Sequence, residues 1–257
     1  MSLHQIKPVY LHPEFNQEFG ITTVITPHEV EKALTNNPGA AAVLITRPNY
    51  YGVCSDIEKI AEIVHRHGKI LAVDEAHGAH LKFGEGLPLC AIEGGADICV
   101  QSAHKTLPAL TQGSYLHVKG ERINLERLKM ILRMLQTSSP SYPIMAMLDV
   151  AREIMQCYGK TLISKLLGNI ELLRKQIEKE DKNKYFRWLT GKDIPGGEKD
   201  PTRIVINVRN LGITGYEADR FLREKYNIFA EMSDLYNVVF IATIADTGES
   251  FDRLKEG

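Results

Sequence analysis

Residues 55–74 read SDIEKIAEIVHRHGKILAVD and contain a complete helix–strand unit. The run Ser55-Asp56-Ile57-Glu58 has the form of a capping box, so a helix is expected to begin there. The apolar residues that follow recur at helical spacing, and Gly68 is expected to end the helix. The short apolar run from Ile70 to Val73 then predicts a buried strand that ends at Asp74.

The same alternation occurs on both sides of this unit. Residues 26–29, TPHE, combine an N-cap hydroxyl, a proline at the first helical position and a returning carboxylate, which predicts a helix to about Leu34. Residues 41–46 and 97–102 are strand-length apolar runs, and the first is expected to be covered on both faces. The pattern predicts an α/β fold with a mainly parallel sheet flanked by helices, and ligands at the carboxyl ends of its strands.

The second half of the chain is predicted to be more helical. Gly113 to Val118 is a further strand. The helix expected at Leu125 to Leu135 carries an apolar stripe that we assign to the core, made of Leu128, Ile131, Leu132 and Leu135. A long helical stretch follows from about Ile144 to Glu180, with a break expected near Gly159 or Gly168. The segment between the two helical regions is expected to interrupt the helix. It consists of Thr137, Ser138, Ser139, Pro140, Ser141, Tyr142 and Pro143.

A polar, Gly/Pro-rich stretch from Asp181 to Asp200 suggests a domain boundary. A strand over residues 203–208 and a helix beginning at Thr214-Gly215-Tyr216-Glu217 follow it. The predicted division is a major domain over residues 1–190 and the start of a smaller, incomplete domain over residues 200–257.

Composition narrows the function classes. The 257 residues are 44% hydrophobic and 25% charged, and 31 Lys+Arg against 32 Asp+Glu give a formal charge of −1, which offers no broad attraction to nucleic acid or anionic lipid. No apolar run reaches the roughly 18 to 20 residues that span a bilayer. The four cysteines form no CxxC pair and predict neither a zinc ribbon nor a disulfide framework, so reduced thiols in a cytoplasmic protein are expected.

Residues 71–80, LAVDEAHGAH, place an acidic pair and two histidines directly after a predicted strand. A DEAH helicase would need a GxxxxGK[ST] phosphate loop earlier in the chain, and none is present. A metal site could use Asp74, His77 and His80, with His65 or His67. A third interpretation is a cofactor site in which Asp74 faces a protonated ring nitrogen.

Residues 101–105, QSAHK, favour the third interpretation because they end the next predicted strand. A lysine among strand ends is partly removed from water, which favours the uncharged amine that attacks a carbonyl. Pyridoxal phosphate requires a lysine that forms a Schiff base and a carboxylate that keeps the pyridine nitrogen protonated. Lys105 and Asp74 satisfy that requirement.

Three segments carry a resemblance to a known family: DEAHGAH, QSAHKTLPALTQGSYLH and LQTSSPSYPIMAMLD. Together they resemble the major domain of the bacterial ornithine/lysine/arginine decarboxylases, which are pyridoxal-phosphate enzymes of the aspartate-aminotransferase fold. The resemblance extends from about Val9 to Phe251. It implies a cytoplasmic homodimer with its site at the subunit interface, and a basic amino acid as the small-molecule substrate.

The resemblance also implies roles for individual residues. Lys105 would carry the Schiff base and Asp74 would pair with the ring nitrogen. Ser102 and His104 would contact the cofactor's phosphate, and Thr137 would reach the phosphate of the cofactor bound to the other subunit. Ala76 would pack against the cofactor's ring, and His77 would lie near its phenolic oxygen. Each of the three residues assigned to a phosphate also has a structural alternative. His104 could be a core histidine, Ser102 could simply end its strand, and Thr137 could be a hydroxyl that ends a helix.

The activity implied is decarboxylation of arginine, with lysine or ornithine as alternatives, as in the Gram-positive biosynthetic arginine decarboxylases of polyamine biosynthesis. An acyl-transferring pyridoxal-phosphate synthase of the same fold, a metal-binding domain and a non-catalytic domain remain alternatives. Full-length members of the family begin with well over a hundred further residues, which supply a phosphate loop and a stacking ring. The chain is therefore expected to be a fragment that binds pyridoxal phosphate weakly and has little or no activity.

Overall fold

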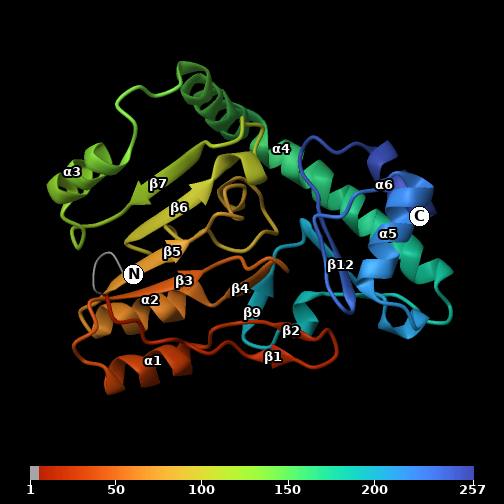
Figure 1. Cartoon of the computed structure of the whole chain (residues 1–257), viewed down its shortest axis with the longest axis horizontal. Coiled ribbons are helices and arrows are strands. Elements are labelled where there is room, and N and C mark those ends of the chain that lie inside the picture. Colours follow the sequence, from red (N-terminus) through yellow and green to blue (C-terminus); the bar gives the residue numbers. More distant parts are fainter. Residues whose placement is uncertain (1–5) are drawn as a thin grey trace.

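The computed structural model describes residues 6–257 (Figure 1). Its first sheet has the strand order β3-β5-β6-β7. The strands β3 (Ala42–Thr46), β5 (Ile70–Asp74) and β6 (Ile98–Ser102) are parallel, and β7 (Ser114–Val118) is antiparallel to β6. The predicted α/β fold with a mainly parallel sheet is confirmed.

Two capped helices cover one face of this sheet. Thr26 caps α1 (Pro27–Asn36), as predicted, by accepting a hydrogen bond from the backbone N–H of Glu29. The predicted cap of α2 (Ile57–Arg66) was displaced by one residue, because Asp56 rather than Ser55 accepts the N–H of Lys59. Both helices bury their apolar side chains against the strands in one core cluster, which includes Val30, Leu34, Ile60, Val64, Val43, Ile45, Leu71 and Val73.

The opposite face of the first sheet is largely uncovered. Leu44, Val100 and Leu116 are 61%, 38% and 40% exposed, and the strand pairing places them on the same face. The expectation that residues 41–46 form a strand covered on both faces is therefore wrong. The alternation of buried and exposed residues along β3 shows that only one side is packed.

The second sheet is antiparallel, with the order β11-β12-β10-β8. Its strands are β8 (Arg187–Trp188), β10 (Arg203–Asn207), β11 (Met232–Ser233) and β12 (Asn237–Ile241). Thr214 forms a capping box with Glu217 and begins α5 (Gly215–Tyr226), as predicted, and α6 (Gly248–Glu256) closes the chain.

Two small ribbons accompany the sheets. β1 (Phe15–Asn16) pairs with β2 (Ile21–Thr22), and β4 (Val53–Ser55) pairs with β9 (Gly197–Lys199). The β4–β9 ribbon ties the loop after β3 to the chain that enters the second sheet, so this loop lies between the two sheets (Figure 1). Within residues 6–257 there are also four short 3₁₀ turns: η2 (Leu81–Phe83), η3 (Ala103–Lys105), η4 (Gly191–Asp193) and η5 (Arg209–Leu211).

The helix α3 (Leu125–Leu135) has the predicted bounds but not the predicted environment. None of its residues is buried, and Leu135 is 76% exposed. It lies at the outer edge of the molecule beyond β7 (Figure 1). The apolar stripe assigned to the core is thus unpartnered in this chain.

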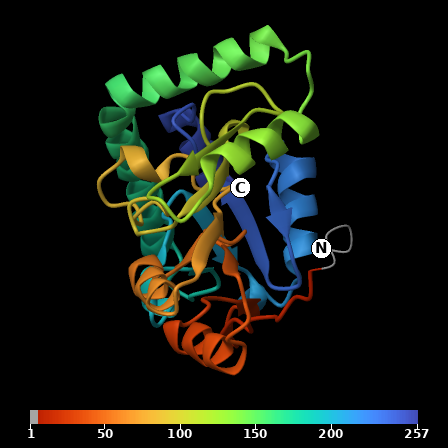
Figure 2. The same ribbon diagram turned by 90° about the vertical axis from the view of Figure 1, so that its left-hand side faces the viewer.

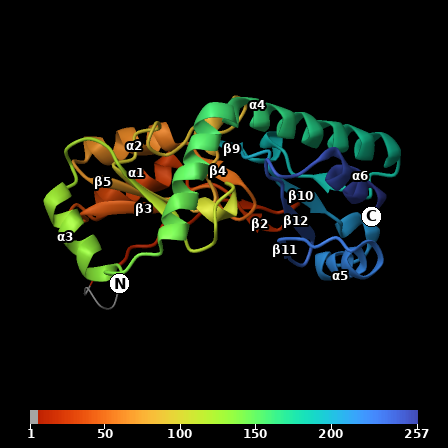
Figure 3. The same ribbon diagram turned by 90° about the horizontal axis from the view of Figure 1, so that it is seen from above.

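The long helix α4 (Tyr142–Glu180) connects the two sheets. It remains helical through Gly159 and Gly168, so the predicted interruption is wrong, although its axis changes direction along its length (Figures 2 and 3). Gly159 lies against Phe83, and a Cβ there would come within 2.9 Å of the Phe83 Cβ. The glycine therefore serves a close contact. Buried side chains of α4 belong to one hydrophobic cluster together with residues that follow the strands of the first sheet and residues of the second sheet. The cluster includes Ala79, Leu107, Met155, Leu166, Ile204 and Phe240.

Candidate active site

The strands β5 and β6 end side by side, and the predicted site residues follow these ends. Asp74 is the last residue of β5 and lies opposite Val100 of β6. Ser102 is two residues beyond Val100, so Asp74 and Ser102 lie on the same, uncovered face of the sheet. Lys105 belongs to η3, which begins directly after Ser102. The topology thus brings the predicted carboxylate, hydroxyl and amine to one sheet edge.

The turn after β5 is fixed by its own side chains. The Oδ1 atom of Asp74 accepts a hydrogen bond from the backbone N–H of Ala76 at 3.1 Å. This turn directs the following residue, His77, to Lys105, whose Nζ lies 3.2 Å from the His77 Nε2. His77 is buried, whereas Asp74 and Lys105 are half-buried. His77 and Lys105 therefore form one group, next to the turn that Asp74 holds.

A residue of the second sheet completes this group. Arg203, the first residue of β10, is fully buried, and its Nη2 lies 2.5 Å from the His77 Nδ1. The ring of Tyr50 lies 4.6 Å from the His77 ring, centroid to centroid. Burial first, and then the charges of Arg203 and Lys105, lower the pKa of His77 to about 4. The imidazole is therefore neutral at pH 7.

The second histidine of the motif has different partners. His80 Nε2 lies 3.1 Å from the Oδ2 of Asp200, and the hydroxyl of Thr202 donates to the Oδ1 of Asp200 at 2.7 Å. Burial alone would raise the pKa of Asp200, but His80, Lys199 and Thr202 together hold it below its usual range. This buried pair anchors the chain that leads into β10.

The metal interpretation is not favoured by this arrangement. Within residues 6–257 no group of three or more His, Cys, Asp or Glu side chains is placed to hold a metal ion. His77 contacts Lys105 and Arg203, and His80 contacts Asp200, so the proposed ligands do not converge. His65 pairs with Asp97 and His67 with Glu31, both away from the motif.

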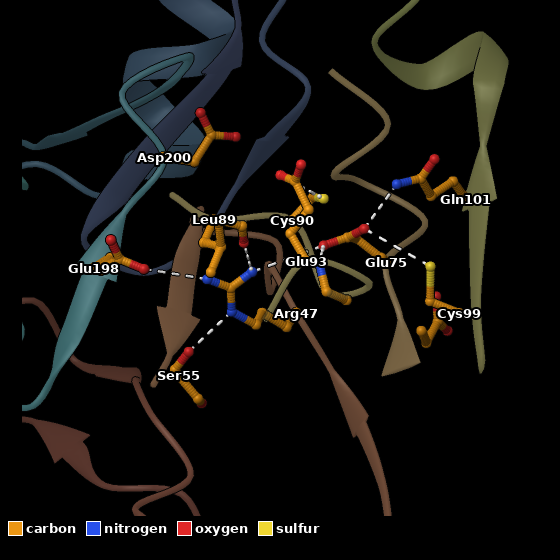
Figure 4. Close-up of polar contacts among 12 residues, drawn as sticks. Arg47, Ser55, Glu75, Leu89, Cys90, Glu93, Cys99, Gln101, Glu198 and Asp200 are labelled. Atoms are coloured by element: carbon orange, nitrogen blue, oxygen red, sulfur yellow. Dashed lines mark hydrogen bonds and ion pairs between the residues drawn. The ribbon is translucent and has the colours of Figure 1, made fainter. Parts of the chain in front are cut away.

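The acidic residue after Asp74 belongs to a separate buried network (Figure 4). Glu75 accepts hydrogen bonds from the Gln101 amide at 2.7 Å and the Ala91 N–H at 2.8 Å, and the Arg47 Nη1 lies 3.7 Å from it. Arg47 also donates to Glu198 and to the backbone carbonyls of Ser55 and Leu89. Burial raises the pKa of Glu75. This network joins β5 and β6 to the β4–β9 ribbon and holds the strand ends in place.

The three residues that were predicted to contact the cofactor's phosphate are not gathered at one point in the way that His77 and Lys105 are. Ser102 is half-buried, and its side chain makes no capping hydrogen bond to η3. The Nδ1 of His104 donates to the carbonyl of Gly113 at 3.2 Å, which is the contact expected of a histidine satisfied by backbone. Thr137 is exposed in the loop between α3 and α4, where its hydroxyl accepts the N–H of Ser139. Thr137 is not among the residues gathered around Lys105.

Sequence reasoning missed Arg203 and Tyr50. Both are distant from the DEAH motif in the sequence, and neither belongs to a recognisable spacing. One local signal was available for Arg203, because an arginine followed by the apolar run Ile204-Val205-Ile206 heads a strand that is otherwise suited to burial.

Several known proteins are similar to this chain in sequence. The model of the family described as "Orn/Lys/Arg decarboxylase, major domain" matches residues 1–199. An arginine decarboxylase from Halalkalibacterium halodurans is 41% identical over 251 residues, which are 96% of this chain and 50% of that protein. One from Bacillus subtilis is 38% identical over 253 residues, which are 97% of this chain and 51% of that protein. The chain spans about half the length of these relatives.

Solved structures show the same fold. Lysine decarboxylase A from Pseudomonas aeruginosa superposes with a TM-score of 0.79 at 22% identity, covering 97% of this chain and 42% of that one. A NifS-like protein from Rickettsia africae has a TM-score of 0.66 at 16% identity, covering 91% of this chain and 65% of that one. At these identities the likeness concerns the fold alone.

Proposed function

This chain belongs to the Orn/Lys/Arg decarboxylase family, and we propose that it forms part of a pyridoxal-phosphate-dependent enzyme that decarboxylates a basic amino acid. Arginine is the proposed substrate, because relatives named arginine decarboxylase are 38–41% identical over 96–97% of this chain. An acyl-transferring synthase and a non-catalytic or metal-binding domain are not favoured. One structural observation carries the proposal: Asp74 ends β5, and Lys105 lies in the turn that follows the neighbouring parallel strand β6, so both are at one sheet edge.

The residues present fit the cofactor. The edge offers an amine from Lys105, a carboxylate from Asp74 and a hydroxyl from Ser102, of which the last two share the uncovered face. A covalent link to Lys105, a pairing of Asp74 with the ring nitrogen and phosphate contacts from Ser102 and His104 use each group in its usual chemistry. Ala76 is small enough to let a flat ring approach.

Pyridoxal phosphate, when bound, supplies the electron sink that allows the bond between Cα and the carboxylate to break. The chain's own residues would attach it, orient it and hold protons. Asp74 would keep a proton on the ring nitrogen, because a carboxylate close by favours the charged form. His77, neutral and buried, would offer a hydrogen bond to the phenolic oxygen. The Lys105 amine would accept and return protons once displaced.

Trapping with borohydride tests the cofactor assignment. The full chain is incubated with pyridoxal phosphate, reduced and mapped by mass spectrometry. We expect the pyridoxyl label on Lys105 and its loss in the Lys105→Arg protein. The matched control is Lys199→Arg, because burial lowers the pKa of Lys199 to about 8 and makes it a competing amine. Label that is spread over exposed lysines and unaffected by Lys105→Arg would contradict the proposal.

Release of carbon dioxide from arginine, lysine and ornithine in parallel, measured on an N-terminally extended version of the chain, tests the substrate. The proposal expects arginine to be preferred and all release to cease in Lys105→Arg. Release that is greater from lysine or ornithine would overturn the choice of arginine and leave the family assignment intact.

The finer expectations are proposals as well. We propose a cytoplasmic homodimer with its site at the subunit interface, acting in polyamine biosynthesis, with Thr137 serving the partner's phosphate site. The exposed position of Thr137 and the exposed apolar side chains of α3 support the interface. We also propose the division into a major domain to residue 190 and a small domain from residue 200. The presence of two sheets supports a division, although β8 (Arg187–Trp188) already belongs to the second sheet.

A further inference from the structure

Arg203 is a buried cation whose position the proposed reaction does not by itself explain. Its side chain is 1% exposed, and only its Nη2 has a side-chain partner, the Nδ1 of His77 at 2.5 Å. Its Nε and Nη1 are buried and have no hydrogen-bond partner among the residues that the structure describes. Unpaired buried donors reduce the free energy of unfolding, so the burial of Arg203 destabilises the folded chain. Arg203 also comes from the second sheet, whereas His77 follows a strand of the first.

The contact with Arg203 determines which nitrogen of His77 carries the proton. A guanidinium has only N–H donors, so the His77 Nδ1 must accept from it. A neutral imidazole has one donor and one acceptor nitrogen, and the accepting Nδ1 therefore leaves the hydrogen on Nε2. The lowered pKa of His77, caused first by burial and then by Arg203 and Lys105, agrees with a neutral ring.

The hydrogen on Nε2 faces the amine of Lys105. The two nitrogens are 3.2 Å apart, which is within hydrogen-bond reach. An ammonium group has no lone pair and cannot accept this hydrogen, whereas an uncharged amine can. The uncharged amine is also the form that attacks a carbonyl group. An uncharged amine at Lys105 is therefore the partner that accepts the Nε2 hydrogen, whereas an ammonium group there would leave two donors facing each other.

We propose that Arg203 is a positioning residue that fixes His77 as its Nε2–H tautomer and so directs a hydrogen bond to the Lys105 amine. The importance of Lys105 rests on the proposed function, but the tautomer does not and can be measured without cofactor. A chain with the Nε2–H tautomer and no label at Lys105 would refute the proposed function while leaving this assignment in place.

The experiment is ¹⁵N NMR of the histidine side chains in the full chain without cofactor. The spectrum distinguishes the two tautomers and the protonated ring. We expect His77 to be the Nε2–H form in the wild type and to lose that preference in Arg203→Met, which removes the donor. Arg203→Lys retains a donor-only group and is expected to keep the wild-type form.

Val205→Ala is the matched control for lost stability. Val205 is fully buried in the same strand and belongs to a core cluster that does not include His77. It should destabilise the fold without changing the His77 tautomer. An unspecific effect of loosened packing would instead appear in Val205→Ala as well as in Arg203→Met.

Acetylation of Lys105 at fixed pH gives a second readout, with the exposed Lys32 as the internal reference. Without Arg203, His77 can accept a hydrogen bond from a charged Lys105, so we expect the Lys105 rate to fall roughly tenfold, the effect of about 1.4 kcal/mol in one hydrogen bond. Val205→Ala should leave the ratio of the two rates unchanged.

Two results would overturn the assignment: a wild-type His77 that carries its proton on Nδ1, or an Arg203→Met protein in which the Nε2–H form and the Lys105 rate both persist. If Arg203→Met does not fold, the tautomer of His77 in the wild-type protein still tests the assignment. A coupling across the hydrogen bond between the Arg203 Nη2 and the His77 Nδ1 is expected, and its absence would be equally decisive against the assignment.

Discussion

At the scale of single residues, His77 is where charges from several elements meet. It is faced by Arg203 from β10, Lys105 from η3, Asp200 from the segment before β10, Tyr50 from the loop before β4, and His80 from its own loop. Burial and the two cations outweigh the carboxylate, so the folded chain resists protonation of this ring.

This resistance makes the stability depend on pH. The pKa of His77 is about 4 in the folded chain, against about 6.5 for an unfolded histidine. Between these values the unfolded chain binds a proton that the folded chain does not, so stability is lost as the pH falls from about 6.5 towards 4. We expect His77→Gln, which keeps a donor and an acceptor but does not titrate, to flatten this loss in urea unfolding at a series of pH values.

His28→Gln is the control for this measurement, because His28 is exposed and should leave the curve unchanged. A His77→Gln protein that loses stability with acid as steeply as the wild type would show that other groups, such as the partly buried His117, account for the loss.

The sequence predicted the near neighbours in the site and not the distant ones. The placement of Asp74, His77 and Lys105 at one sheet edge could be predicted, because they end or follow neighbouring parallel strands and the ends of such strands share an edge. Arg203 could not, because its place depends on how β10 of the second sheet lies against the first. No local periodicity encodes that relation.

At the scale of elements, the turn before β4 sets the position of Arg203. Gly52 has a φ of +76°, and a Cβ there would come within 2.5 Å of the Arg203 Cβ. Its carbonyl also accepts the N–H of Asp200 at 2.8 Å. Glycine is therefore needed at this position for two reasons: the backbone is left-handed, and the Arg203 side chain approaches closely.

Gly52→Ala is therefore expected to destabilise the chain by roughly 2 to 4 kcal/mol, combining the cost of positive φ with overpacking. Gly68→Ala separates the two causes, because Gly68 also has a positive φ of 68° but nothing within 4 Å of its Cβ position. It should cost only about 1 to 2 kcal/mol. Equal losses in urea unfolding would show that the approach to Arg203 is unimportant.

The helix α3 leads to a prediction about assembly. Met134 and Leu135 are 73% and 76% exposed, although the helix is amphipathic. If this stripe is the proposed dimer interface, Leu135→Glu should shift the chain from dimer to monomer in sedimentation, with its stability changed by only about 0.5 kcal/mol. Leu172→Glu replaces a leucine of α4 that is 56% exposed and should leave the dimer intact. A monomeric wild type would contradict the proposal.

Element bounds were predicted more successfully than element environments. The bounds of α3 followed from its apolar periodicity, but the pattern could not show that nothing within residues 6–257 covers its apolar stripe. The interruption of α4 was expected at Gly159 because glycine disfavours helix. Its contact with Phe83 instead makes glycine the residue that fits.

At the scale of the whole molecule, the two sheets share one core. Leu107 and Ala79, which follow the first sheet's strands, belong to the same buried cluster as Ile204 and Phe240 of the second. A core that spans both sheets couples their unfolding. Of the helices in the part of the chain that the structure describes, none is sufficiently long and apolar to cross a membrane.

We therefore expect one unfolding transition. Trp188 is the only tryptophan and reports on the second sheet, whereas Cys99 is buried in β6 and reports on the first when its labelling is followed by mass spectrometry. Both signals should have the same urea midpoint. The exposed Cys157 should react without urea and serves as the reference. Midpoints that separate would show that the two sheets unfold independently.

The uncovered face of the first sheet has a practical consequence for handling the protein. Leu44, Val100 and Leu116 present apolar groups across three strands of a chain whose formal charge is only −1. Salts such as ammonium sulfate strengthen contacts between apolar surfaces, and a small charge provides little repulsion between molecules. The chain should thus precipitate early on salting out and adhere firmly to hydrophobic-interaction resins, and low ionic strength is the condition that favours keeping it dissolved.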